Sequence, residues 1–129
     1  MTIIDHLSVG VPSIAEAAKF YDGLLATIGA RNLAQNDAFA AYGDTSPMFL
    51  VMLPFDKQAQ TAGNGVHIGF KAPSREAVDA FHAHALKHNG TCEGAPGPRE
   101  GYPNMDVYTA YVRDPFGNKL EIIFNGFSA

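Results

Sequence analysis

Apolar and polar residues alternate in two similar stretches of the chain, residues 4–11 and 66–72. Alternation with a period of two predicts β-strands that bury one face. A shift of 61 residues places residues 6–13 on residues 67–74 without a gap, with His, Pro and Ser identical. The same register matches two further pairs, Phe20 with Phe81 and Gly29 with Gly90. These identities indicate an internal repeat.

A helix is predicted after each of these strands, over residues 14–28 and 75–89. Apolar residues recur there at three- and four-residue spacing, as in a helix with one buried face. Ser13 and Ser74 stand just before the helices, where a hydroxyl can accept a hydrogen bond from a free backbone amide. Gly29 and Gly90 follow the helices. We expect both glycines to end the helices in a left-handed conformation.

Short strand-like segments follow each helix. They cover residues 31–35, 38–42 and 48–53 in the first half, and a segment near Thr91, 107–113 and 119–124 in the second. We therefore predict an α+β fold, in which two βαβββ repeats form a cupped mixed sheet with the helices on its outer face. The expected single domain spans residues 1–129, with repeat one at about 1–55, a linker at about 56–64 and repeat two at about 65–126. A Gly- and Pro-rich insertion at 94–106 has no counterpart in repeat one.

The composition limits the partners of this chain. It has 129 residues, a formal net charge of −4 and a pI of about 5.6, so no basic field exists to bind nucleic acid or an anionic membrane. No apolar run approaches the roughly 18–20 residues that a membrane-spanning helix needs, and no signal-peptide pattern opens the chain. We expect a cytoplasmic protein that binds neither nucleic acid nor membrane. The single cysteine, Cys92, cannot form an internal disulfide, and its sequence neighbours supply no activating group.

Three possible metal ligands fall on one face of the predicted sheet. Alternation directs His6 away from the apolar side of its strand, and His67 takes the equivalent place in repeat two. Glu121 alternates with Leu120 and Ile122, so its carboxylate points to the same side. Two imidazoles and one carboxylate can hold a divalent ion and leave positions open for substrate or water. We predict such a site at His6, His67 and Glu121; the alternative is a polar-lined pocket that binds its ligand without metal.

Four segments resemble the vicinal oxygen chelate superfamily, which includes glyoxalase I, extradiol dioxygenases, fosfomycin-resistance enzymes and bleomycin-resistance proteins. They are Ile-Asp-His-Leu-Ser-Val-Gly-Val at 4–11, Phe-Tyr at 20–21, Val-His-Ile-Gly-Phe at 66–70, and Tyr-Val-Arg-Asp-Pro-Phe-Gly-Asn-Lys-Leu-Glu at 111–121. The Asp-Pro-x-Gly-Asn turn shortly before a carboxylate is the most specific of these. The resemblance implies the paired βαβββ fold, the metal triad and a homodimer. It leaves open whether His6 joins His67 and Glu121 of its own chain or of a partner chain.

Within this superfamily the residues favour a glyoxalase-like metalloenzyme. In such a protein a divalent ion chelates two neighbouring oxygens of a small substrate, in a lyase, isomerase or conjugating reaction. Iron, manganese, nickel, cobalt and zinc are not distinguished by the sequence. Glyoxalase I itself is disfavoured, because Leu50 stands where that enzyme has a fourth ligand, a glutamate.

Two other functions stay open. One is a non-catalytic small-molecule binding protein of the bleomycin-resistance type, which generally lacks the metal ligands. The other is a ferrous extradiol-type dioxygenase, which needs a further histidine near the site. The remaining histidines, His82, His84 and His88, fall on the second helix, where we expect a solvated surface.

Five polar residues are candidates for substrate binding: Ser8, Arg99, Tyr102, Tyr108 and Tyr111. Ser8 follows His6 as in the His-x-Thr opening of fosfomycin-resistance thiol transferases, whose hydroxyl lies beside the metal. Those enzymes have basic residues after the metal-binding glutamate, whereas residues 125–129 include none. A guanidinium such as that of Arg99 can pair with a substrate carboxylate, and a phenol can donate to an oxyanion or stack on a ring. Strand alternation separates Tyr108 from Tyr111, so we expect at most one of them to face the cavity.

Overall fold

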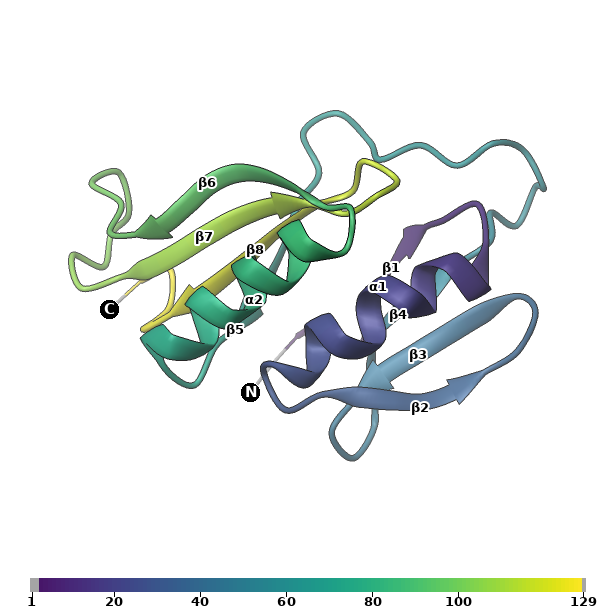
Figure 1. Ribbon diagram of the computed structural model, residues 1–129, viewed down its shortest axis with the longest axis horizontal. Helices are drawn as coiled ribbons and strands as arrows, with labels where there is room; N and C mark the ends of the chain where they lie inside the picture. The colour runs from purple at the N-terminus through teal and green to yellow at the C-terminus, as the bar shows by residue number, and fades with distance from the viewer. Residues whose placement is uncertain (1–2, 129) are drawn as a thin grey trace.

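The computed structural model of the chain describes residues 3–128, and it confirms the predicted α+β fold (Figure 1). The elements follow in the order β1 (Leu7–Gly10), α1 (Ile14–Ala26), β2 (Arg31–Gln35), β3 (Phe39–Gly43), β4 (Pro47–Met52), β5 (Ile68–Lys71), α2 (Arg75–Lys87), β6 (Thr91–Gly97), β7 (Tyr108–Arg113) and β8 (Lys119–Phe124). This order is βαβββ twice. Neither helix in the described part of the chain is long and apolar enough to cross a membrane.

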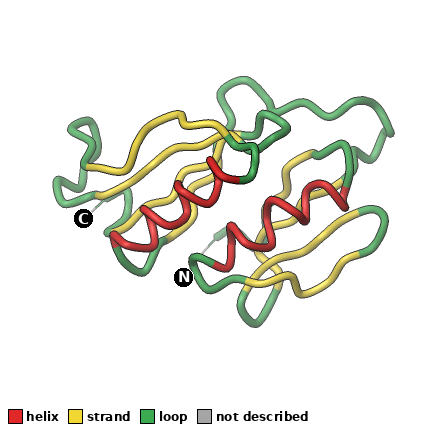
Figure 2. The backbone as a smooth tube through the Cα atoms, viewed as in Figure 1, coloured by secondary structure: helices red, strands yellow, loops and turns green. Residues whose placement is uncertain are grey.

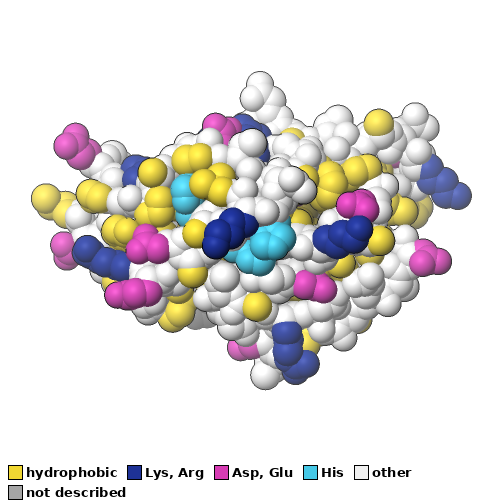
Figure 3. All heavy atoms as spheres, in the orientation of Figure 1, with side chains coloured by type: hydrophobic (Ala, Val, Ile, Leu, Met, Phe, Trp, Pro, Cys, Tyr) yellow, Lys and Arg dark blue, Asp and Glu magenta, His cyan; other side chains and the backbone are white. Residues whose placement is uncertain are grey.

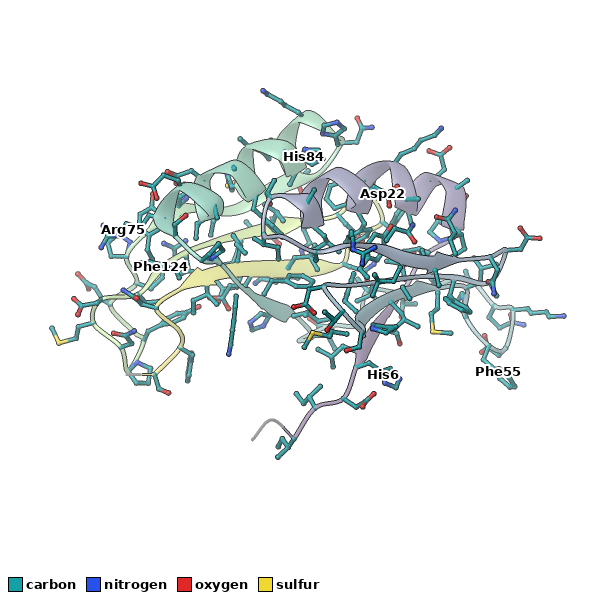
Figure 4. All side chains as sticks on the ribbon, turned by 90° about the horizontal axis from the view of Figure 1, so that it is seen from below. His6, Asp22, Phe55, Arg75, His84 and Phe124 are labelled. Atoms are coloured by element: carbon teal, nitrogen blue, oxygen red, sulfur yellow. The ribbon has the colours of Figure 1, made fainter. Side chains whose placement is uncertain are left out.

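Each repeat builds one four-stranded mixed sheet. The strand orders are β1-β4-β3-β2 and β5-β8-β7-β6, so the first strand of each repeat pairs with the last. That pairing is parallel, and the other pairs are antiparallel. Both helices cover the same side of the two sheets, and within residues 3–128 the other side carries no helix (Figures 1, 2 and 4).

The predicted helix starts are confirmed. Ser13 Oγ accepts a hydrogen bond from the backbone amide of Glu16 at 3.2 Å, and Ser74 Oγ accepts one from Ala77 at 3.1 Å. Each hydroxyl occupies one of the amides that a helix leaves unpaired at its first turn. The two repeats share a Ser before the helix, and in both the hydroxyl caps the first turn.

The predicted helix ends are right at Gly29 and wrong at Gly90. Gly29 has φ +84°, the left-handed conformation expected of it. In the second repeat Asn89 takes that conformation, with φ +70°, because the turn closes one residue earlier. Gly90 is required for space instead: a Cβ there would lie 2.7 Å from the carbonyl oxygen of Ala85 and 2.8 Å from that of Arg113.

The first strand of each repeat is shorter than the alternation suggests. Because β1 begins at Leu7 and β5 at Ile68, His6 and His67 lie directly before their strands. β6 in turn reaches Gly97, so the first residues of the expected insertion continue the sheet. The insertion proper is the loop between β6 and β7.

The apolar faces of both helices and both sheets form one continuous core. α1 buries Phe20 and Leu24, and α2 buries Phe81. Phe49 of β4 and Phe70 of β5 meet edge to face, with ring centroids 5.0 Å apart. Such aromatic contacts add packing energy beyond the buried area, and this one joins the core of repeat one to that of repeat two.

A buried polar contact also connects the repeats. Asp114, in the turn between β7 and β8, is only 3% exposed. Its Oδ2 accepts hydrogen bonds from the hydroxyl of Tyr21 in α1 at 2.5 Å and from the side-chain amide of Asn118 at 2.9 Å. The Asn118 amide also donates to the carbonyl of Gly10, at the end of β1, at 2.9 Å. The turn of repeat two is thereby attached to a helix and a strand of repeat one.

We expect Tyr21→Phe to destabilise the protein by about 1–3 kcal/mol, because it removes a hydrogen bond to a buried charged group and leaves Asp114 with fewer donors. Tyr42→Phe is the matched control, since the Tyr42 hydroxyl donates to Asp22, which is exposed and can bind water instead. Urea unfolding followed by circular dichroism measures both changes. Equal stability losses in the two variants would contradict a special role of the Tyr21–Asp114 contact.

Candidate metal site and cavity

His67 and Glu121 are brought together by the parallel pairing of β5 with β8. Gly69 lies opposite Glu121 in this pairing, and His67 is two residues before Gly69 and so shares its side of the sheet. His67 Nε2 lies 3.2 Å from Glu121 Oε1. Gly69 adds no side chain beside this pair; a Cβ there would lie 3.7 Å from Oε1, an ordinary van der Waals contact.

The Glu121 carboxylate is held in one orientation. It is 5% exposed, and its Oε2 accepts hydrogen bonds from the hydroxyls of Tyr102 at 2.6 Å and Thr109 at 2.7 Å. The Tyr102 hydroxyl is also hydrogen-bonded to the hydroxyl of Tyr111. Two donors therefore occupy Oε2, and Oε1 faces His67.

The His67–Glu121 pair fits two ligands of one metal ion. Metal–nitrogen and metal–oxygen bonds of about 2.0–2.2 Å, separated by an angle of roughly 90–110°, place two ligand atoms about 3.0–3.5 Å apart. The observed 3.2 Å lies within this interval. Hydrogen bonds from outer residues to a ligating carboxylate are typical of metal sites, because they fix its orientation. Tyr102 and Thr109 supply them here.

A cavity of about 410 Å³ opens beside this pair. It is lined by His67 and Glu121 and by three residues that the sequence nominated for substrate binding, Arg99, Tyr102 and Tyr111. The loop between β6 and β7 supplies Arg99, whose guanidinium donates to the backbone carbonyls of Ala95, Gly97 and Pro98. These bonds hold a positive charge at the cavity wall.

The other nominated residues lie elsewhere in the chain. His6 is largely exposed on the side of the sheets away from the helices (Figure 4), with its Nδ1 2.6 Å from Asp5. Ser8 lies in β1 of repeat one and is also exposed. Tyr108 faces the helical side, where its hydroxyl donates to Asp79 of α2 at 2.7 Å. Among residues 3–128 no three His, Cys, Asp or Glu side chains of one chain are close enough to hold an ion together.

The sheet of repeat one has no carboxylate where repeat two has Glu121. Leu50 pairs with Ser8 in β4, as Glu121 pairs with Gly69 in β8. The expected equivalence of Leu50 and Glu121 is therefore present in the strand register. An apolar side chain therefore occupies the position of repeat one that is equivalent to Glu121.

Two residues of the site escaped the sequence analysis. Thr109 lies two positions before Tyr111 and on the same side of β7, so strand alternation could have found it. Phe127 lines the cavity and packs on the Tyr102 ring, with centroids 5.2 Å apart. It follows the last strand, where no periodicity indicates its position.

The phenols of the site are poor acids. Burial, followed by the hydrogen bonds to Glu121 and Tyr111, raises the pKa of Tyr102 well above its ordinary value. Burial also raises the pKa of Tyr111. Both hydroxyls therefore keep their protons at neutral pH and act as donors.

The chain belongs to the Glyoxalase/Bleomycin resistance protein/Dioxygenase superfamily, whose family model matches residues 3–122. A search of curated protein sequences finds no match. Among solved structures, the chain is similar to a glyoxalase/bleomycin resistance protein from Albidiferax ferrireducens T118. The two are 37% identical with a TM-score of 0.87, over 97% of this chain and 100% of that one.

Two more distant structures share the fold. A glyoxalase-related enzyme from Fulvimarina pelagi is 18% identical with a TM-score of 0.73, over 97% of this chain and 89% of that one. A glyoxalase/bleomycin resistance protein/dioxygenase family enzyme from Burkholderia phytofirmans PsJN is 17% identical with a TM-score of 0.71, over 93% and 96% of the two chains. At these identities the likeness concerns the fold alone.

We expect alkaline titration to show no tyrosine ionising at the ordinary pH of about 10 while the protein is folded. The chain has five tyrosines and no tryptophan, and the pKa of each tyrosine is raised, mainly by burial or by a carboxylate partner. Because the folded state holds phenol protons that the unfolded chain releases, the stability they contribute is complete below about pH 10 and is lost as the pH rises further.

The measurement is the ultraviolet absorbance of tyrosinate as a function of pH, with circular dichroism recorded in parallel. Tyrosinate should form together with loss of structure, and the urea-unfolded chain, as a control, should titrate near pH 10. A tyrosine that ionises near pH 10 in the folded protein would contradict the assignment.

Proposed function

We propose that this chain is a glyoxalase-like metalloenzyme in which His67 and Glu121 hold a divalent ion, completed by His6. The observation that carries the proposal is the His67–Glu121 pair, at ligand spacing and with the second carboxylate oxygen already occupied by hydroxyl donors. When bound, a divalent ion supplies Lewis acidity for two neighbouring oxygens of a small substrate. The reaction class is a lyase, isomerase or conjugating step.

The remaining cavity residues bind and orient the substrate. Arg99 offers a guanidinium that can pair with a substrate carboxylate. Tyr102 donates its single hydroxyl proton to Glu121. Tyr111 keeps its proton and can turn it from the Tyr102 hydroxyl to a substrate oxygen. Phe127 and the Tyr102 ring form an apolar wall that excludes water from one side of the ligand. A small, oxygen-rich anion with an apolar or planar part fits this lining.

We place the third ligand, His6, across a homodimer. His6 is 58% exposed in its side chain and lies on the sheet side that no helix covers (Figure 4). Two large apolar side chains nearby are also exposed. Leu7 follows His6 in the chain, and Met48, which is 55% exposed, lies on β4. An exposed apolar surface of this kind favours burial against another protein surface. A second copy of the chain can cover it and bring His6 to the partner's cavity.

A binding protein of the bleomycin-resistance type is the second candidate, favoured by the aromatic cavity wall. Such a protein needs no ion, so the two functions differ in a direct measurement. An extradiol-type dioxygenase would contain iron and consume oxygen. Elemental analysis and oxygen uptake therefore distinguish all three.

We expect the purified protein to bind one divalent ion per chain, and His6→Ala, His67→Ala and Glu121→Ala each to abolish that stoichiometry. Tyr102→Phe should weaken ion binding about 10–100-fold, as loss of an outer-shell partner does. Tyr108→Phe is the matched control with unchanged affinity, because Tyr108 lies on the helical side. Elemental analysis and calorimetric titration with manganese, nickel, cobalt and zinc provide the measurements. Equally low metal content in all these proteins would favour the metal-free binding protein.

Mixed dimers of His6→Ala and Glu121→Ala chains test the shared site. If the ligands come from two chains, each mixed dimer regains one site from the intact His6 of one chain and the intact His67 and Glu121 of the other. Random mixing should then restore about one quarter of the wild-type metal content, since about half of the dimers are mixed. No restoration would show that each site belongs to one chain. A monomeric wild-type protein in solution would likewise overturn the shared site, while leaving the His67–Glu121 pair to be tested by itself.

A further inference from the structure

Cys92 has a histidine partner that its sequence neighbours do not reveal. It lies in β6, the edge strand of the second sheet, and is exposed. In the strand pairing it stands opposite Val112, a core residue on the helical side, so its thiol points toward α2. There His82 Nε2 lies 3.2 Å from Cys92 Sγ. The pair combines a nucleophile and a base in hydrogen-bond contact, the minimal arrangement for an activated thiol.

The surroundings of His82 keep its imidazole ring neutral. Partial burial lowers the pKa of His82, and the opposing effect of Asp79, three residues earlier on α2, is smaller. His82 is therefore mostly neutral at neutral pH, and its ring nitrogen can accept the thiol proton. Asp79 is itself fixed by the hydroxyl of Tyr108 at 2.7 Å. On β6 the neighbouring Glu93 is paired with Arg113 at 2.5 Å, so Asp79 is the carboxylate whose charge favours the protonated form of His82.

The thiol lies on the other side of the sheet from the proposed metal site. The strand register shifts between Cys92 and Gly94, so these two residues lie on opposite sides of the sheet although they are two positions apart. Gly94 pairs with Tyr111 and approaches the Arg99 guanidinium on the cavity side. Cys92 instead lies on the helical side, where α2 also presents its histidines (Figure 3). A group attached to the sulfur would extend over this exposed edge and would leave the cavity open.

We propose that Cys92 and His82 form a reactive thiol site, at which Cys92 forms a mixed disulfide with one half of a small disulfide molecule. Cys92 Sγ attacks one sulfur of the disulfide, while its proton passes to His82 Nε2. The old S–S bond breaks as the new one forms, and the departing sulfur takes a proton and leaves as a thiol. Cys92 is oxidised and the departing sulfur is reduced, so no other oxidant is needed. The site does not depend on the metal assignment.

Because the chain has one cysteine, every thiol reaction reports on Cys92 alone. We expect oxidised glutathione to add one glutathione unit to the native protein, seen by mass spectrometry, and to add none to Cys92→Ala. At neutral pH, His82→Ala and His82→Gln should both react at least about tenfold more slowly than wild type, because neither side chain can take the proton. Above roughly pH 8.5, where free thiols ionise without help, the difference should disappear.

His88→Ala is the matched control, since His88 is an exposed histidine at the end of the same helix. It should react at the wild-type rate. Two results would overturn the proposal: wild-type rates in both His82 variants at neutral pH, or an equal slowing in His88→Ala. Cys92→Ala should bind the same amount of metal as the wild type. The thiol proposal and the metal proposal are therefore tested independently, and either can fail without the other.

Discussion

The buried contact of Asp114 with Tyr21 and Asn118 holds the two repeats in one arrangement. A carboxylate that is almost wholly buried is stable only when its oxygens accept hydrogen bonds, and here the donors come from both repeats. Asp114 also shapes the turn that leads into β8, because its Oδ1 accepts from the amides of Phe116 and Asn118. The strand that carries Glu121 is thus aligned by the same carboxylate that joins the repeats.

In the candidate site, too, a buried carboxylate is held by hydrogen bonds from surrounding side chains. Tyr102 and Thr109 donate hydrogen bonds to Oε2 of Glu121, which leaves Oε1 free to bind a ligand beside His67. Preorganised donors of this kind lower the reorganisation needed when a charged ligand binds. The loop that supplies Arg99 and Tyr102 is the part of repeat two that repeat one lacks. The second sheet therefore has a cavity wall and a hydrogen-bond donor to its carboxylate that the first sheet lacks, although both sheets have the same strand order.

Much of the fold could be predicted because its signals are local. Repeated strand–Pro–Ser–helix segments and strand alternation depend on neighbouring residues, and alternation alone placed Glu121 and His67 on one side. The Gly90 prediction failed for a local reason, because the turn after α2 closes one residue earlier, at Asn89. What the sequence could not show are contacts between distant segments, such as the Arg113 carbonyl that also restricts the space at Gly90. Which of Tyr108 and Tyr111 faces the cavity depends on how α2 lies over β7, and the His82–Cys92 contact likewise depends on how α2 lies beside β6.

Leu50 gives the repeated architecture a functional asymmetry. Two halves with the same strand order would offer matching sheet faces, yet one face presents a carboxylate and the other a hydrocarbon side chain at the same register. Substitutions among the apolar residues around Leu50 can change the shape of a surface that contacts a ligand or partner without changing its charge. The duplicated scaffold can thus diversify in what it recognises while one half retains its chemistry.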